Sequence, residues 1–111
     1  MVIVKDKTIM VSKGCTFTTL FELDKSGYTL DGTETITFNV QKNPEDTTVL
    51  LSLPCGIDVL NNIISVYGTK TEMSVLAAGT YFYDIVMTLT SGARHTLMYP
   101  SKFIVREVCY E

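Results

Sequence analysis

The residues of this chain that could perform covalent or acid–base chemistry are few and widely spaced. The 111 residues include three cysteines, Cys15, Cys55 and Cys109, and one histidine, His95. A nucleophilic site needs a cysteine or serine close to a base, so any cysteine–histidine pair would have to use His95. No cysteine lies in a reactive-loop signature. The sequence therefore predicts structural or incidental thiols and no enzymatic activity.

Metal ligation is also poorly supported by the spacing of these residues. The three cysteines and one histidine form no CxxC or HxxxH pair, which a zinc site of the usual kind would contain. Asp24, Asp31 and Glu34 cluster near turns and could supply oxygen ligands to calcium. No EF-hand loop pattern surrounds them, so the sequence favours turn-forming acids and predicts neither metal nor cofactor.

Carbohydrate chemistry is the remaining possibility. Glu22 and Asp84 could act as an acid–base pair. Each lies on the polar face of its expected strand, however, and exposure of that face to solvent is enough to explain both acids. Exposed aromatic rings could instead stack on a sugar. Phe82 stands out because it occupies the polar parity of its strand, and we interpret it as a covered edge residue or a protein–protein contact.

Composition excludes several classes of partner. The formal net charge is −3 with 19% charged residues, so there is no basic surface to bind nucleic acid. No window approaches the roughly 18 uninterrupted apolar residues of a membrane span, and the N-terminus does not resemble a signal peptide. An odd number of distant cysteines predicts reduced thiols and assembly in a cytoplasm. The 46% hydrophobic content is high for a small domain, which suggests that other subunits cover some of it.

Alternating apolar residues in short runs predict the elements that would position any site. The inward-facing set expected from this alternation comprises Phe17, Phe21, Ile36, Phe38, Val49, Leu51, Tyr83, Ile85, Met87 and Phe103. Turn signals at 24–27, 43–46 and 91–92 separate the runs, and no long helical pattern intervenes. The sequence predicts one domain over residues 1–111, an all-β antiparallel sandwich of seven to nine strands.

Two local signals refine this fold. Thr69 and Glu72 fit a helical capping box, so one or two turns of helix are expected after residue 69. The stretch LAAGTYFYDI then enters a strand through Gly79, with Tyr81 two residues before the core position Tyr83. In immunoglobulin-like sandwiches a tyrosine at this place bonds back to the preceding loop. We expect the Tyr81 hydroxyl to form a hydrogen bond with the backbone within residues 74–79. The alternative is that Tyr81 is simply one more aromatic residue that faces the core.

The same stretch carries a family resemblance. The segments KGCTFTTLFEL, DKSGYTLDGTETITFNVQKN and LAAGTYFYDIVMTLTSGARHTLMYPSKFIV resemble small immunoglobulin-like structural proteins of tailed phages, most nearly the N-terminal domain of baseplate upper proteins. The matching residues are Leu76, Ala78, Gly79, Tyr81, Tyr83, Asp84, Ile85, Phe103 and Val105. The resemblance implies an immunoglobulin-like sandwich in a phage or prophage virion. Unlike the larger baseplate proteins, this sequence ends directly after the domain, which argues against a receptor-anchoring role.

The expected function is therefore a non-enzymatic structural or assembly module of the tail or baseplate type, assembled in the bacterial cytoplasm and located in the virion. Its expected partners are further copies of itself or other virion proteins. The alternative is a module that binds cell-surface glycans or proteins through loops at one end of the sandwich. The candidate interface residues are Val2, Ile3, Val4, Ile9, Met10, Val11 and Phe82. The first six could form an apolar ribbon that pairs with a neighbouring subunit, or could close their own sandwich as its first strand.

Overall fold

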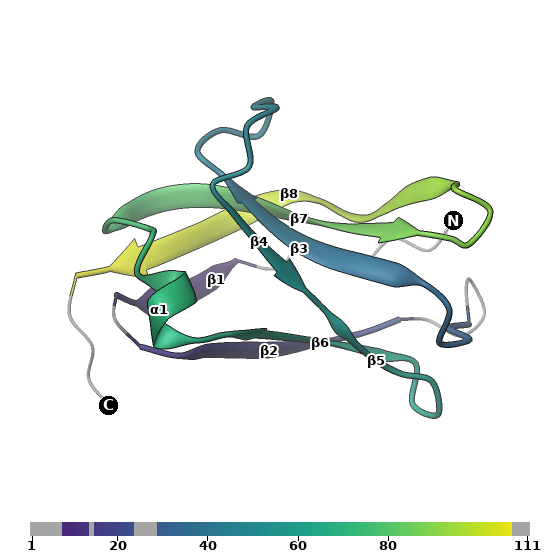
Figure 1. Cartoon of the computed structure of the whole chain (residues 1–111). Helices are drawn as coiled ribbons and strands as arrows, with labels where there is room; N and C mark the ends of the chain where they lie inside the picture. Colours follow the sequence, from purple (N-terminus) through teal and green to yellow (C-terminus); the bar gives the residue numbers. More distant parts are fainter. Residues whose placement is uncertain (1–7, 14, 24–28, 108–111) are drawn as a thin grey trace.

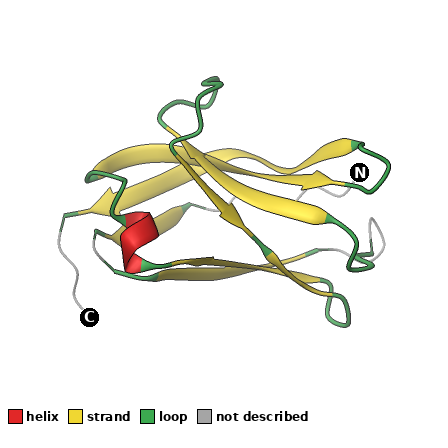
Figure 2. Cartoon of the chain, viewed as in Figure 1, coloured by secondary structure: helices red, strands yellow, loops and turns green. Residues whose placement is uncertain are grey.

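The fold consists of strands in two layers. The computed structural model describes residues 8–13, 15–23 and 29–107, with only the backbone described at 98–100. Its elements are β1 (Ile9–Ser12), β2 (Phe17–Glu22), β3 (Thr35–Gln41), β4 (Leu51–Pro54), β5 (Gly56–Asp58), β6 (Ile63–Gly68), α1 (Lys70–Met73), β7 (Gly79–Thr88) and β8 (Arg94–Arg106). The two layers face each other, with α1 at one end (Figure 1). The predicted all-β sandwich with one short helical turn is confirmed (Figure 2).

The two layers are a five-stranded sheet, in the order β1-β8-β7-β3-β4, and a three-stranded sheet, in the order β2-β6-β5. All strand pairs between the described residues are antiparallel except one. β1 runs parallel to β8, with Ile9 opposite Phe103. The prediction of a wholly antiparallel sandwich is therefore wrong for this pair. Alternation of apolar residues reveals which face of a strand is buried but carries no information about the direction of its neighbour.

The chain changes sheets between β4 and β5. β4 pairs with β3 in the five-stranded sheet, and β5 pairs with β6 in the three-stranded sheet. Only Cys55 separates the two strands, and its backbone N–H donates to the carbonyl of Ile36 at 2.9 Å. This segment descends from one layer to the other along the side of the sandwich (Figure 1). It closes that side because one continuous piece of chain belongs to both sheets.

The core lies between the sheets and is rich in aromatic rings. Phe38 stacks on Tyr83 with ring centroids 4.8 Å apart, and Phe103 meets Phe17 edge to face at 5.4 Å. Such pairs contribute about 0.5–1.5 kcal/mol each beyond their buried area. Nine of the ten predicted core residues are buried, and the exception is Val49, which is 43% exposed. Val49 lies outside because β4 begins only at Leu51, so residues 47–50 belong to the loop after β3.

Local signals at the strand ends act as expected. The Thr69 hydroxyl accepts from the Glu72 N–H, and the Glu72 carboxylate accepts from the Thr69 N–H, which completes the capping box of α1. The turn at 43–46 closes with a bond from Asp46 N–H to the Asn43 carbonyl at 3.1 Å. After the turn at 91–92, β8 continues as a single strand from Arg94 to Arg106.

Candidate functional site

Tyr81 lies near the start of β7, and its side chain bridges back to the loop that precedes the strand. Its hydroxyl donates to the carbonyl oxygen of Ala77 at 2.7 Å, within the predicted segment. The Lys42 ammonium lies 4.8 Å from the centre of the Tyr81 ring and covers it. Gly79 enters the strand with a φ of 154°. A β-carbon there would meet only ordinary contacts, so the backbone conformation is what favours glycine. The predicted tyrosine corner is present.

Removing this hydroxyl should weaken the fold. We expect Tyr81→Phe to lower the free energy of unfolding by about 1 kcal/mol, because the Ala77 carbonyl loses its protein partner while the ring keeps its packing. Urea denaturation of the two proteins measures the difference. Tyr67→Phe serves as the matched control, because Tyr67 is 57% exposed and should cost little. An unchanged midpoint for Tyr81→Phe would show that the corner does not stabilise the fold.

The predicted apolar ribbon is only partly a surface. Val2, Ile3 and Val4 lie outside the described residues. Ile9 is buried in the core of its own sandwich, and Val11 packs against that core. Both were predicted to be interface residues. The Ile9 side chain instead packs inside its own sandwich, because β1 pairs with β8, which matches the alternative of a first strand that closes the sandwich. Met10 points the other way and is 51% exposed.

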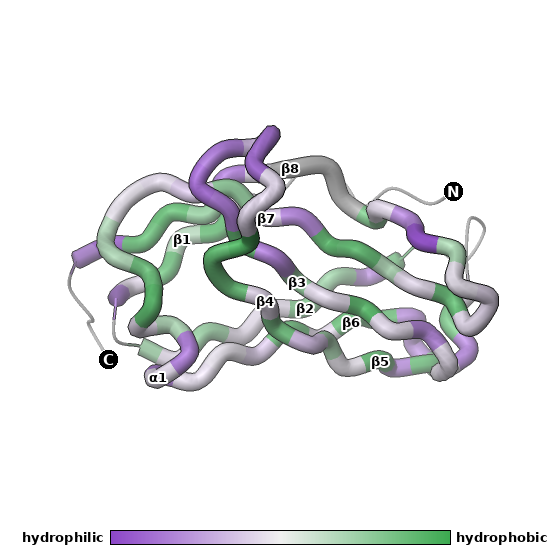
Figure 3. The backbone as a smooth tube through the Cα atoms, turned by 45° about the horizontal axis from the view of Figure 1, so that its top comes forward, coloured by the Kyte–Doolittle hydropathy of each residue, from purple (hydrophilic) through white to green (hydrophobic). Residues whose placement is uncertain are grey.

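Phe82 lies in the middle of the five-stranded sheet. β7 is its central strand, so the interpretation of Phe82 as an edge residue is wrong. Its neighbours Tyr81 and Tyr83 are buried against the core, whereas Phe82 faces outward and is half-buried. Gln41 and Lys102 lie opposite it on the two adjacent strands. Hydrophobic and hydrophilic residues alternate along the adjacent strand β3 in Figure 3.

The outer face of the five-stranded sheet combines an apolar patch with a polar ladder. Ile104 lies opposite both Met10 and Thr80, one step along from the row that contains Phe82. Met10, Phe82 and Ile104 therefore share one region of this face. Towards β4, the Asn39 side chain donates to Asp84 at 3.1 Å and accepts from Ser52 at 2.8 Å. The patch is thus bounded on one side by side chains that are already hydrogen-bonded to one another.

The outer face of the three-stranded sheet carries a second apolar pair that the sequence analysis did not select. Leu20 is 58% exposed and Tyr67 is 57% exposed. Leu20 lies opposite Ser65, two residues before Tyr67, so the two side chains are diagonal neighbours. The signal was available, since Leu20 breaks the apolar parity of its strand. What the sequence did not provide was the pairing of β2 with β6 that brings the two residues together.

The cysteines do not share one chemical state. Cys15 is disulfide-bonded, so the prediction of three reduced thiols is wrong. Cys55 is free, and burial raises the pKa of its thiol to about 12 because the thiolate would lose its hydration. Such a thiol is a poor nucleophile near neutral pH. Cys109 lies outside the described residues.

The acidic residues that were considered as calcium ligands have structural partners where the structure describes them. Glu34 accepts from the N–H groups of Asp31 and Gly32, and Asp31 accepts from the N–H and hydroxyl of Thr33. These bonds from Thr33 lower the pKa of Asp31. Both carboxylates therefore shape the turn, as the favoured interpretation held, and Asp24 lies outside the described residues. No group of three potential metal ligands occurs in the described part of the chain.

The two acids considered as a catalytic pair are on different layers. Glu22 belongs to β2 in the three-stranded sheet, and Asp84 belongs to β7 in the five-stranded sheet. Each faces outward, so the whole thickness of the sandwich separates them, and packed sheets alone are about 10 Å apart. They cannot flank one glycosidic bond.

Comparisons with known proteins inform the fold alone. No family model matches the chain, and no curated protein is significantly similar to it. Among solved structures it is similar to the PmoD soluble domain from Methylocystis sp. ATCC 49242 (Rockwell), with a TM-score of 0.50 and 15% sequence identity. The similarity covers 86% of this chain and 76% of that chain. Among the described residues, no helix is long and apolar enough to cross a membrane.

Proposed function

We propose that this chain is a non-enzymatic structural module of a phage or prophage virion, of the tail or baseplate type, that acts through protein–protein contacts. The observation that carries the proposal is the presence of large, exposed apolar side chains on both outer sheet faces. Met10, Leu20 and Tyr67 are each more than half exposed. Exposed apolar side chains that gather on a sheet face favour a docking surface, because contact with a partner removes them from water.

Two further features support this proposal. The phage resemblance includes Gly79 and Tyr81, and these residues form a tyrosine corner, a feature of immunoglobulin-like sandwiches. Disulfides persist outside reducing cytoplasm, and virion surfaces are among the places where they occur. The bond at Cys15 therefore fits a protein that acts in a released particle.

The proposal is tested by asking where the protein resides. Particles should be purified from induced cells that carry the gene, and their proteins quantified by mass spectrometry. The expected result is this chain at a fixed ratio to the tail proteins, retained through a density gradient. Its absence from intact particles, with the protein present in the same cells, would overturn the proposal.

An alternative is a module that binds cell-surface glycans or proteins through its end loops. The specific observation in its favour is Leu60, which is 82% exposed in the turn between β5 and β6 and lies next to the exposed Val59. A glycan array and whole-cell binding assay test it. Binding that Leu60→Ser abolishes, and that Val75→Ser at the other end of the sandwich leaves intact, would favour this alternative.

A further inference from the structure

We propose that the partner of this chain is a second copy of itself, stacked so that the outer face of the five-stranded sheet of one copy contacts the outer face of the three-stranded sheet of the next. The inference rests on the proposed function in one respect, that the chain acts through protein contacts. It adds the partner and the two surfaces.

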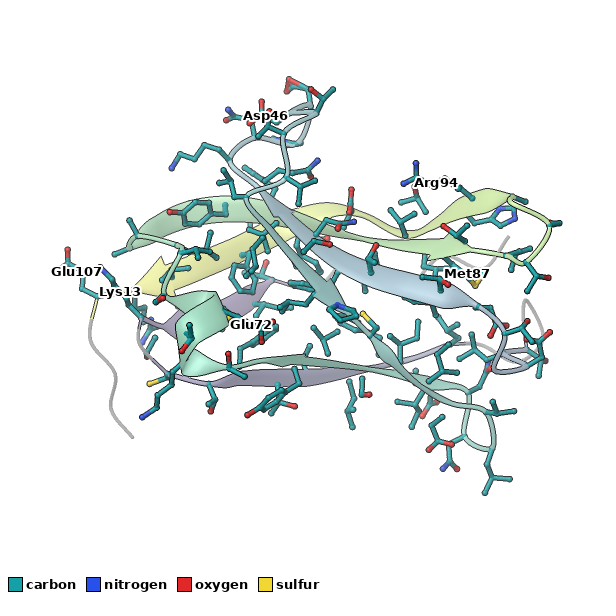
Figure 4. All side chains as sticks on the ribbon, in the orientation of Figure 1. Lys13, Asp46, Glu72, Met87, Arg94 and Glu107 are labelled. Atoms are coloured by element: carbon teal, nitrogen blue, oxygen red, sulfur yellow. The ribbon has the colours of Figure 1, made fainter. Side chains whose placement is uncertain are left out.

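The charges of the two faces are opposite. Arg94, Lys102 and Arg106 lie at outward positions of β8, and Asp84 on β7 is the one acid among the outward strand positions of this sheet that the structure describes. Arg94 projects away from the sandwich in Figure 4. These strand positions therefore carry three cations against one acid. The 43–46 turn lies over Gln41 at one margin of this face, since the Gln41 amide donates to the Asp46 carbonyl.

The outer face of the three-stranded sheet is acidic. Glu22, Ile63 and Asp58 form one row across it, because Ile63 lies opposite Glu22 on one side and Asp58 on the other. The next row contains Leu20, Ser65 and Gly56, and the last contains Thr18 and Tyr67. None of these outward strand residues is basic. The two faces of one copy therefore attract the opposite faces of another copy.

The apolar groups are also arranged for contact. On one face Met10, Phe82 and Ile104 form a patch with Lys102 and Arg106 beside it. On the other face Leu20 and Tyr67 stand beside short side chains, since Ser65 is small and a β-carbon at Gly56 would lie 2.5 Å from the Ser65 hydroxyl. An apolar centre with charges at its margin is the usual arrangement of a specific interface.

A stacked interface would use most of a face, and the β4 edge is a poor alternative. The molecule measures 39 by 30 by 22 Å, so the about 800 Å² per partner that a standard interface buries corresponds to most of one face. β4 has four residues, ends at Pro54, and leaves its sheet directly afterwards. Short strands and proline are the devices that discourage edge-to-edge pairing.

Contact between different faces has a consequence for assembly. Each copy that binds through one face leaves its other face available for the next copy. Such heterologous contacts produce rings when the rotation closes and open filaments when it does not. Both outcomes are repeating assemblies of the kind that a virion tail contains.

The experiment exchanges the charges. Purified wild-type protein, Lys102→Glu and Glu22→Lys are compared by light scattering behind a sizing column over a range of concentrations. The wild type should self-associate, and each variant should do so about tenfold more weakly or less, because each then meets a face of its own sign. An equimolar mixture of the two variants should associate again, since the altered cationic face of one complements the altered acidic face of the other.

Two charge changes away from both faces serve as controls. Lys13→Glu and Glu107→Lys make the same charge changes at exposed positions beyond the ends of β1 and β8, where Figure 4 labels both residues, and should associate like the wild type. Thermal denaturation of every variant checks that it is folded. A wild type that stays monomeric at high micromolar concentration, or a mixture that stays as weak as its components, would overturn the stacking. The location of the protein in particles is measured independently, so failure here leaves that result to decide the proposed function.

Discussion

Breaking the disulfide at Cys15 is expected to lower the free energy of unfolding by about 2–5 kcal/mol, the usual cost of losing a native disulfide in a small domain. Cys15 is 8% exposed and lies between β1 and β2. The bond therefore restrains the part of the chain where it passes from one sheet to the other. Urea denaturation of Cys15→Ser, and of wild-type protein with and without reductant, measures the loss.

Thiol counting in denaturant identifies the bond directly. The chain has three cysteines, Cys15 is bonded and Cys55 is free. An intrachain bond therefore leaves one thiol in the wild type, none in Cys55→Ser and two in Cys15→Ser. Denaturant is needed because burial raises the pKa of Cys55 to about 12 and slows its alkylation in the folded state. Three thiols in freshly purified, non-reduced wild type would contradict the bond. Cys55→Ser also serves as the stability control.

Replacing Asn62 by alanine should cost about 3 kcal/mol, the second largest effect that we expect. Asn62 is fully buried in the turn between β5 and β6. Its side-chain oxygen accepts from the Leu30 N–H at 2.7 Å, and its amide group donates to the Leu23 carbonyl at 3.2 Å. Alanine leaves both backbone groups without this partner in a buried place. It must also adopt the positive φ of 57° that asparagine tolerates.

Two variants separate these causes. Asn62→Gly relieves the backbone strain but restores neither hydrogen bond. Its free energy of unfolding should therefore lie between that of Asn62→Ala and that of the wild type. Asn61→Ala removes the exposed neighbour, whose side chain bonds to Asp58, and should change stability by only a few tenths of a kcal/mol. Urea denaturation of the three variants measures this series. Equal stabilities for Asn61→Ala and Asn62→Ala would show that the buried amide does not tie the loop.

Predictions based on neighbouring residues were the reliable ones. The capping box at Thr69 and Glu72, the turn at 43–46 and the corner at Tyr81 all depend on groups within four residues of each other. Backbone geometry at that range is set by residue type and spacing, so a pattern is enough to predict it. The buried role of Asn62 was not predicted, because its partners Leu23 and Leu30 are distant in the sequence.

The candidate interface illustrates the opposite case. Apolar residues 9–11 were expected to form a ribbon on the surface or the first strand of the sandwich, and the structure places Ile9 in the core. The decision depends on β8, more than 90 residues later, which provides an open edge for β1. Whether an apolar strand is interior or exposed depends on whether a partner covers it, and a single run of sequence does not contain its partner.

The sequence by itself determined the class of fold, the inward face of most strands and the local turns, because the alternation of apolar side chains and the chemistry of glycine, proline and asparagine act over a few residues. Only the tertiary structure decided which strands are neighbours, and with that the parallel pair of β1 and β8, the disulfide at Cys15 and the composition of both outer faces. The cations of β8 and the acids of β2 and β5 were visible as letters in the sequence. They became two surfaces of opposite charge only when the sheets were assembled, because pairing between distant strands brings side chains far apart in the sequence onto one face.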